Sequence, residues 1–155
     1  MYKLVIISDI HHDLLRLKRI LPIINASDYL IFCGDGVSDL MLLRSVISVP
    51  IVCVRGNNDL DPSVPEISSM VLGNTRVLVT HGHKFDVRRS ITPLLKVAKQ
   101  MQCNLVFFGH THMFFDRIID GVHFINPGAL HGRAYGTYAA VAGDGEMFFS
   151  KEGFV

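Results

Sequence analysis

The strongest clue to the architecture is a set of short apolar segments that stop abruptly at glycine, aspartate, asparagine or histidine. Each segment is rich in β-branched or aromatic residues, which is typical of strands buried on both faces. In open α/β sheets, ligands bind beyond the carboxyl ends of the strands. Six polar turns of this kind would therefore meet at one cleft. They are Ser8–His11, Gly34–Asp35, Arg55–Asp59, Thr80–His83, Gly109–His112 and Asn126–Gly128.

The first third of the chain alternates between strand patterns and helix patterns. Strands are predicted at Lys3–Ile7, Tyr29–Cys33 and Ile51–Val54. Apolar residues spaced for one helix face predict helices between them, at Asp13–Ile24 and Ser38–Ile47, and the first residue of the second helix is its expected N-cap. Strands joined by helical crossovers run parallel to one another, so a parallel sheet is expected here.

The rest of the chain is dominated by hairpin patterns. Gly-Asn, Asp-Gly and Gly-Asp-Gly sequences, which favour tight turns, join three pairs of strand-like segments. We therefore expect an α/β protein in which two mixed sheets stack with helices outside, forming a single domain over residues 1–155. The expected pairs are Ile67–Leu72 with Thr75–Thr80, Met113–Ile118 with Val122–Ile125, and Tyr138–Ala142 with Glu146–Ser150, beside a helix at Ser90–Met101 and a strand at Asn104–Phe108.

Composition excludes several classes of protein. The 155 residues are 49% hydrophobic with a formal net charge of +1, which suits a buried core and argues against disorder. Lys and Arg number 15 against 14 Asp and Glu, so there is no strong nucleic-acid signature. No apolar run approaches the roughly 18 residues of a membrane span, and no signal peptide is expected. We expect buried, reduced thiols and a cytoplasmic protein, because no CxxC pair occurs among Cys33, Cys53 and Cys103.

Carboxylates and imidazoles in the polar turns are candidate metal ligands. Asp9 and His11 are two residues apart directly after a strand, and in an extended backbone both side chains would point the same way. His110 and His112 share this spacing. Carboxylate, imidazole and amide ligands without cysteine suit Mn, Fe, Co, Ni or Zn. The candidates outnumber the needs of one ion, so two divalent ions are expected, and such a pair can activate a bridging hydroxide for in-line displacement at phosphorus.

A single histidine after a strand is more often a surface or hydrogen-bonded residue than a ligand. We therefore assign no ligand role to His12, which is expected to face away from His11, or to His123 and His131, which lie outside the clusters. Asp13 is expected at a helix N-terminus. The clustered residues are different, because chance would have to supply Asp, Asn or His at four separate strand ends.

In this order, Asp9-x-His11, Gly34-Asp35, Gly56-Asn57, His81 and Gly109-His110-Thr111-His112 resemble the calcineurin-like metallophosphoesterase superfamily, in particular its small single-domain bacterial and archaeal phosphodiesterases. The resemblance implies a four-layer α-β-β-α sandwich, a small phosphodiester substrate and two divalent ions, with Mn as the expected metal. Spacing alone does not choose between Asn57 and Asn58, whereas the family pattern selects Asn57. It places one ion on Asp9, His11 and His112 and the other on Asn57, His81 and His110, with Asp35 bridging them.

The chain departs from the wider family at Asn58. Many members have a histidine there that is thought to protonate the leaving group or hold the phosphate, and an amide cannot act as a general acid. His83 is the nearest replacement in the sequence, and its alternative role is to support the ligands by hydrogen bonding. We therefore expect Asn58 to contact the substrate, with His83 as the candidate proton donor. Because the usual histidine is absent, aryl esters should be cleaved much faster than alkyl esters.

A non-enzymatic scaffold is the alternative function. The retromer complex contains a subunit of this fold that serves mainly as a protein-binding surface, so the fold alone does not prove catalysis. Every expected ligand position nevertheless keeps a residue able to bind metal, which favours the enzyme.

Two aromatic segments, Met113–Phe115 and Met147–Phe149, place apolar side chains on both faces of their sheets. One set of side chains would pack between the sheets. The other set needs cover from the Ser90–Met101 helix or from a second subunit, so a homo-oligomer is also an expectation.

Overall fold

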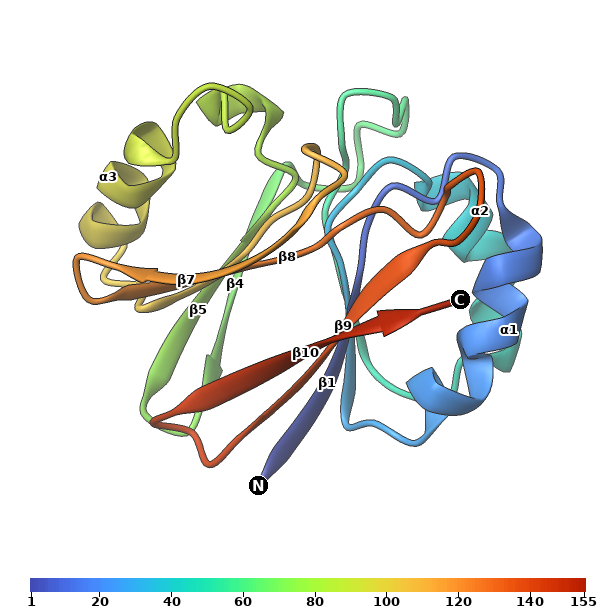
Figure 1. Ribbon diagram of the computed structural model, residues 1–155, viewed down its shortest axis with the longest axis horizontal. Coiled ribbons are helices and arrows are strands. Elements are labelled where there is room, and N and C mark those ends of the chain that lie inside the picture. The colour runs from blue at the N-terminus through green and yellow to red at the C-terminus, as the bar shows by residue number, and fades with distance from the viewer.

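Two five-stranded β-sheets stack face to face at the centre of the protein, in a computed structural model that describes residues 1–155 (Figure 1). Helices lie outside both sheets (Figure 1). The strands are β1 (Tyr2–Ile7), β2 (Tyr29–Phe32), β3 (Ile51–Cys53), β4 (Ile67–Leu72), β5 (Thr75–Thr80), β6 (Leu105–Phe107), β7 (Phe114–Ile119), β8 (Val122–Pro127), β9 (Thr137–Gly143) and β10 (Phe148–Phe154), and the helices are α1 (Leu14–Asn25), α2 (Val37–Leu42) and α3 (Thr92–Gln100).

The topology confirms the expected four-layer α-β-β-α sandwich of two mixed sheets. The first sheet has the order β10-β9-β1-β2-β3, and β1, β2 and β3 are parallel, as predicted for the first third of the chain. The second sheet has the order β4-β5-β6-β8-β7, with β5, β6 and β8 parallel. The chain therefore has six parallel-type strand ends from which a polar turn can begin.

Three apolar clusters hold the layers together. On β1, Leu4 and Ile6 point between the sheets, whereas Val5 and Ile7 point outward to the layer of α1. This alternation explains why Leu4–Ile7 are all apolar, since both faces of the strand are buried over these residues. In the same way, α3 packs on the outer face of the second sheet through Leu94.

Helix α2 differs from the prediction. It begins at Val37 rather than Ser38 and ends at Leu42, and a separate 3-10 turn follows it. Ser38 is therefore not the N-cap, which is Gly36 without any side-chain capping bond of its own. The physical reason is that a carboxylate from another loop does the capping: Asp59 Oδ1 accepts hydrogen bonds from the backbone N–H groups of Gly36 and Val37, at 2.9 and 2.8 Å.

The last hairpin also differs from the prediction. Strand β10 begins at Phe148 rather than Glu146 and continues to Phe154 rather than ending at Ser150, pairing with β9 along its whole length. Asp144 Oδ1 accepts hydrogen bonds from the backbone N–H groups of Glu146 and Met147, so those residues belong to the turn. The predicted strand end was wrong because register with β9, not local apolar periodicity, determines it.

The two aromatic segments are covered differently. In β7, Phe114 packs against the cluster between the sheets and Phe115 against the cluster under α3, so the chain's own helix supplies the cover there. In β10, Phe148 joins the cluster between the sheets, whereas the Phe149 side chain is 67% exposed.

The cysteines are all free, but only two match the expectation of burial. Cys33 and Cys103 are buried, whereas Cys53 is partly exposed because the short strand β3 forms an edge of its sheet. None of the helices is both long enough and apolar enough to cross a membrane.

Candidate metal centre

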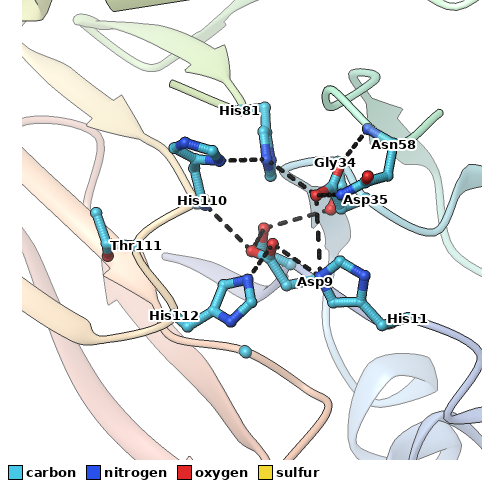
Figure 2. A network of polar contacts seen from close by, with 12 residues as sticks. Asp9, His11, Gly34, Asp35, Asn58, His81, His110, Thr111 and His112 are labelled. Carbon is cyan, nitrogen blue, oxygen red and sulfur yellow. Dashed lines mark hydrogen bonds and ion pairs between the residues drawn. The ribbon is translucent and has the colours of Figure 1, made fainter. Parts of the chain in front are cut away.

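Six of the seven predicted ligands meet at the carboxyl edge of the two sheets (Figure 2). Each comes from a turn that directly follows a parallel strand, as the sequence predicted. The turn after β1 supplies Asp9 and His11, the turn after β2 supplies Asp35, the turn after β5 supplies His81, and the turn after β6 supplies His110 and His112.

The backbone that presents five of these six ligands is left-handed rather than extended. Asp9, His11 and Asp35 have φ angles of 54°, 43° and 61°, and His110 and His112 have 69° and 62°. The expectation that an extended backbone aligns Asp9 with His11 was therefore wrong, although the two side chains do converge. A non-glycine residue in this conformation typically costs about 1–2 kcal/mol, and such strain is concentrated at functional sites.

Asp9 is fully buried at the centre of the cluster. Its Oδ2 accepts hydrogen bonds from Ser8 Oγ at 2.6 Å and from the backbone N–H of His110 at 3.1 Å. Its Oδ1 faces His112 Nε2 at 2.9 Å and His11 Nε2 at 3.4 Å. Burial alone would raise the pKa of Asp9, but the neighbouring imidazoles of His11 and His112 hold it well below the ordinary value. This carboxylate is therefore ionised.

Asp35 lies between His11 on one side of the cluster and His81 on the other. Its Oδ2 lies 3.4 Å from His81 Nε2 and 3.9 Å from His11 Nε2. Burial opposes ionisation, but interactions with His81 and Asn58 lower the pKa of Asp35 to about 2. A carboxylate that faces ligands from both halves has the position that a bridging ligand needs.

His81 and His110 are neighbouring imidazoles, and a hydrogen bond fixes the orientation of the His81 ring. His81 is fully buried, and its Nδ1 lies 2.7 Å from the carbonyl oxygen of Cys33. When Nδ1–H donates to that carbonyl, Nε2 is left facing the cluster as a ligand atom. His110 Nδ1 lies 3.2 Å from His81 Nε2. Burial, His81 and Arg88 lower the pKa of His110 to about 4, so this imidazole is neutral and able to bind a cation.

The residues present fit divalent cations. Asp9 Oδ1 and His11 Nε2 are buried and have no hydrogen-bond partner, although they lie only 3.4 Å apart. Buried polar atoms are almost always paired, so orphaned ligand atoms that face each other indicate a missing partner such as a cation. Two groups of residues each bring their ligand atoms within 4.8 Å of one another. One group is Asp9, His11 and His112, and the other is Asp9, Asp35 and His81.

The two asparagines of the β3 turn lie differently from what the family pattern implies. Asn58 Nδ2 donates a hydrogen bond to Asp35 Oδ2 at 2.6 Å (Figure 2). Asn57, the expected ligand, has an exposed side chain outside the contacts that join the cluster. Gly56 precedes them because a Cβ at that position would lie 2.1 Å from Asp35 Oδ1. The turn therefore approaches Asp35 closely, and the side chain that contacts Asp35 is that of Asn58 rather than Asn57.

The other predicted residues lie around this centre. The His83 ring lies 5.4 Å from that of His81 and 6.2 Å from that of His110, measured between ring centroids. His12 faces away from the cluster as expected, with its Nδ1 3.1 Å from Asp39 Oδ1, and Asp13 is the N-cap of α1. His123 pairs with Asp116 on β7.

Sequence reasoning missed the contacts that three residues make. Asp59 accepts hydrogen bonds from four backbone N–H groups and so joins the β2 turn to the β3 turn; the donors are Asp35, Gly36, Val37 and Gly56. Asn126 Nδ2 donates to the carbonyl oxygen of Gly109 at 2.9 Å, which fixes the turn that carries His110. His131 was assigned no role, yet its ring centroid lies 6.0 Å from that of His11. Asp59 and Asn126 had a signal in the sequence, since both lie in the polar turns that follow strands, whereas His131 lies outside these turns.

Comparison with known proteins identifies one family model and several relatives. Residues 2–144 match the family model described as the calcineurin-like phosphoesterase superfamily domain. Among individual relatives, a probable metallophosphoesterase of Bacillus subtilis is 29% identical over 103 residues, which are 66% of this chain and 59% of that protein. Vacuolar protein sorting-associated protein 29 of Schizosaccharomyces pombe is 32% identical over 79 residues, 51% of this chain and 42% of that protein. The chain thus spans about half the length of these two relatives.

A phosphodiesterase of Methanocaldococcus jannaschii matches more evenly, with 27% identity over 148 residues that cover 84% of this chain and 85% of that protein. Solved structures share the fold. A conserved protein of Streptococcus pneumoniae TIGR4, described as a predicted phosphoesterase, superposes with a TM-score of 0.78 at 24% identity, covering 99% of this chain and 98% of that one. Vps29 of Entamoeba histolytica in complex with Zn²⁺ superposes with a TM-score of 0.77 at 18% identity, covering 99% and 98%.

Proposed function

The chain belongs to the calcineurin-like phosphoesterase superfamily, and on that premise we propose that it is a metal-dependent phosphodiesterase with two divalent cations in its active site. The proposed ligands are the six clustered residues together with Asn57. Asn57 is included on the family pattern, and its exposed side chain would have to rotate toward the cluster to join them. Manganese is the proposed metal, because carboxylate, imidazole and amide ligands without thiolate suit it.

When bound, two divalent cations hold phosphoryl oxygens, polarise phosphorus and lower the pKa of the attacking water. The chain's own residues supply the rest of the site. Asp9 and Asp35, both held ionised, offset the charge of the cations. The hydrogen bond between His81 Nδ1 and Cys33 fixes one imidazole so that its Nε2 faces the cluster without further rearrangement.

Asn58 and His83 are the proposed substrate-contacting residues. The Asn58 side chain is exposed at the rim of the centre while its amide reaches Asp35, so it can donate a hydrogen bond to a phosphoryl oxygen beside the bridging carboxylate. His83 lies beside His81 and His110, and its Nδ1 is buried without a hydrogen-bond partner. That position suits a group that hands a proton to the departing oxygen.

The observation that carries the proposal is the pair of orphaned ligand atoms, Asp9 Oδ1 and His11 Nε2, inside a buried cluster of ionised carboxylates. The test is hydrolysis of bis(4-nitrophenyl) phosphate with and without Mn²⁺. Asp35→Ala and His81→Ala should each lower the rate by about 100-fold or more. Losing a residue that only supports a metal ligand can already cost about 100-fold, and these substitutions remove proposed ligands. His123→Ala is the matched control, since His123 pairs with Asp116 away from the cluster. Equal, metal-independent rates in all four proteins would refute the proposal.

The scaffold remains the second candidate, because Vps29 proteins are among both the relatives and the structural neighbours. Metal binding does not separate the two functions, since the Entamoeba histolytica Vps29 structure is itself a complex with Zn²⁺. Turnover separates them. A protein that binds Mn²⁺ at the cluster but leaves aryl phosphodiesters intact would favour the scaffold.

A further inference from the structure

Basic side chains gather around one carboxylate on the rim of the metal centre. Arg55 Nη2 lies 3.5 Å from Glu66 Oε1, and Lys84 Nζ lies 3.3 Å from Glu66 Oε2. His83 Nε2 approaches the same carboxylate at 3.9 Å. Arg55 follows β3 and His83 follows β5, so the cluster lies at the edge where the candidate ligands also lie. We refer to Arg55, Glu66, His83 and Lys84 as the basic rim.

The basic rim has a hydrogen-bond donor that Glu66 does not satisfy. Arg55 Nε is buried without a partner. Donors buried in this way are rare in native proteins and usually mark a missing ion, water or ligand. A phosphate group carries more acceptor oxygens than the Glu66 carboxylate and binds guanidinium groups well.

The basic rim is also next to the reacting centre. The His83 ring lies within 6.2 Å of the rings of His81 and His110, which are proposed ligands of one cation. A further cation, Arg88, donates hydrogen bonds from Nε and Nη2 to the carbonyl oxygen of His110, at 3.2 and 3.0 Å. A molecule of modest size can therefore reach the metals and the basic rim together.

Charge differs between the basic rim and a hollow beside α2. This hollow includes His12, Ser38 and Asn58, but its charged residues are the carboxylates Asp59 and Asp61. Arg55, Lys84 and Arg88 do not line it. An anionic extension of a bound substrate is therefore attracted toward the basic rim and repelled from the α2 side.

We propose that Arg55 and Lys84 bind a second phosphate group of the substrate, and that Glu66 occupies this subsite as an internal anion until the substrate displaces it. The proposal rests on the phosphodiesterase function proposed above. It narrows the substrates to phosphodiesters that carry another phosphate a few bonds from the one that is cleaved, as dinucleotides with a 5′-phosphate do.

The test compares two competitive inhibitors of bis(4-nitrophenyl) phosphate hydrolysis at saturating Mn²⁺: adenosine 5′-monophosphate and adenosine 3′,5′-bisphosphate. The wild-type protein should bind the bisphosphate about tenfold more tightly, the gain typical of new charge-assisted hydrogen bonds. Lys84→Ala should reduce this preference about threefold, since Lys84 is a largely exposed cation. Glu66→Gln should increase the preference, because the internal anion is removed. Lys96→Ala, an exposed lysine on α3, is the matched control and should leave the preference unchanged.

Equal affinity for the two nucleotides in the wild type would overturn the proposal. So would a preference that is the same in Lys84→Ala and Glu66→Gln as in the wild type. If the protein does not hydrolyse the ester, calorimetric titration of the same nucleotides into Mn²⁺-loaded protein yields the same ratio as dissociation constants. A failure of the phosphodiesterase function is thereby distinguished from a failure of the second phosphate subsite.

Discussion

Asn58 holds both oxygens of the Asp35 carboxylate. Its side-chain amide donates a hydrogen bond of 2.6 Å to Asp35 Oδ2, and its backbone N–H donates one of 2.9 Å to Asp35 Oδ1. Asp35 Oδ2 is also the atom that faces His81 Nε2 at 3.4 Å. The residue at which this chain departs from the wider family is therefore the residue that orients the proposed bridging ligand.

Asn58→Ala should weaken metal binding. The substitution removes the amide bond to Asp35 but keeps the backbone bond, so the carboxylate becomes freer to rotate. We expect the Mn²⁺ concentration at half-maximal activity to rise about tenfold, as is typical when a partner of a metal ligand is lost. Asn74→Ala is the control, because the Asn74 amide contacts only Glu146 on a distant turn. An unchanged Mn²⁺ dependence in Asn58→Ala would show that Asn58 does not position Asp35.

The leaving group should control the rate strongly. Asn58 cannot donate a proton as an acid. His83 gives only weak assistance, because burial and His81 lower its pKa, whereas full general-acid help is typically worth about 10²–10⁴-fold. Rates for a series of aryl and alkyl esters should fall steeply as the pKa of the leaving alcohol rises. Asn58→His should flatten that dependence, and His83→Ala should steepen it. A flat dependence in the wild-type protein contradicts the prediction.

Asp59→Asn should destabilise the fold as well as the site. The carboxylate accepts hydrogen bonds from four backbone N–H groups. In the variant, the NH₂ group of the amide would face some of these N–H groups and could not accept their hydrogen bonds. Losing charge-assisted hydrogen bonds of this kind costs about 3 kcal/mol, which is about 9 °C in Tm for a protein of this size. Thermal unfolding followed by circular dichroism in the absence of metal measures the shift. Asp61→Asn, at an exposed position in the same loop, should change Tm little.

The cysteines should resist alkylation in the folded protein. Burial raises the pKa of the Cys53 thiol to about 12 and raises those of Cys33 and Cys103 as well. A higher pKa leaves less of the reactive thiolate at pH 8, about one part in ten thousand at a pKa of about 12 against roughly one in four for an ordinary thiol. Iodoacetamide at pH 8 should therefore label all three thiols in urea but label the native protein slowly. Rapid labelling of native Cys53 would show that its thiol is not shielded.

The sequence was sufficient for the parts of the fold that local patterns determine. Strands β4 and β5 have the predicted bounds, because Gly73 adopts a φ of 59° in the turn between them and both strands show clear patterns. The meeting of six proposed ligands was also predictable, since the buried strands end in polar turns at one edge.

Long-range contacts account for what the sequence could not predict. The start of α2 depends on Asp59, which lies 22 residues from Val37. The length of β10 depends on pairing with β9. His131 lies beside His11 because its backbone N–H bonds to the carbonyl oxygen of Asp9, and no local pattern encodes that contact. The choice between Asn57 and Asn58 likewise depends on how the β3 turn approaches Asp35 across the sheet.

The most direct test of the account is anomalous diffraction from crystals grown with Mn²⁺. We predict two Mn peaks within the cluster, one beside Asp9, His11 and His112 and the other beside His81 and His110, with Asp35 contacting both. About 3.5–4 Å should separate the two ions, as in other two-metal hydrolytic sites. A map with no anomalous peak inside the cluster, in crystals that bind Mn²⁺ elsewhere, would contradict the account.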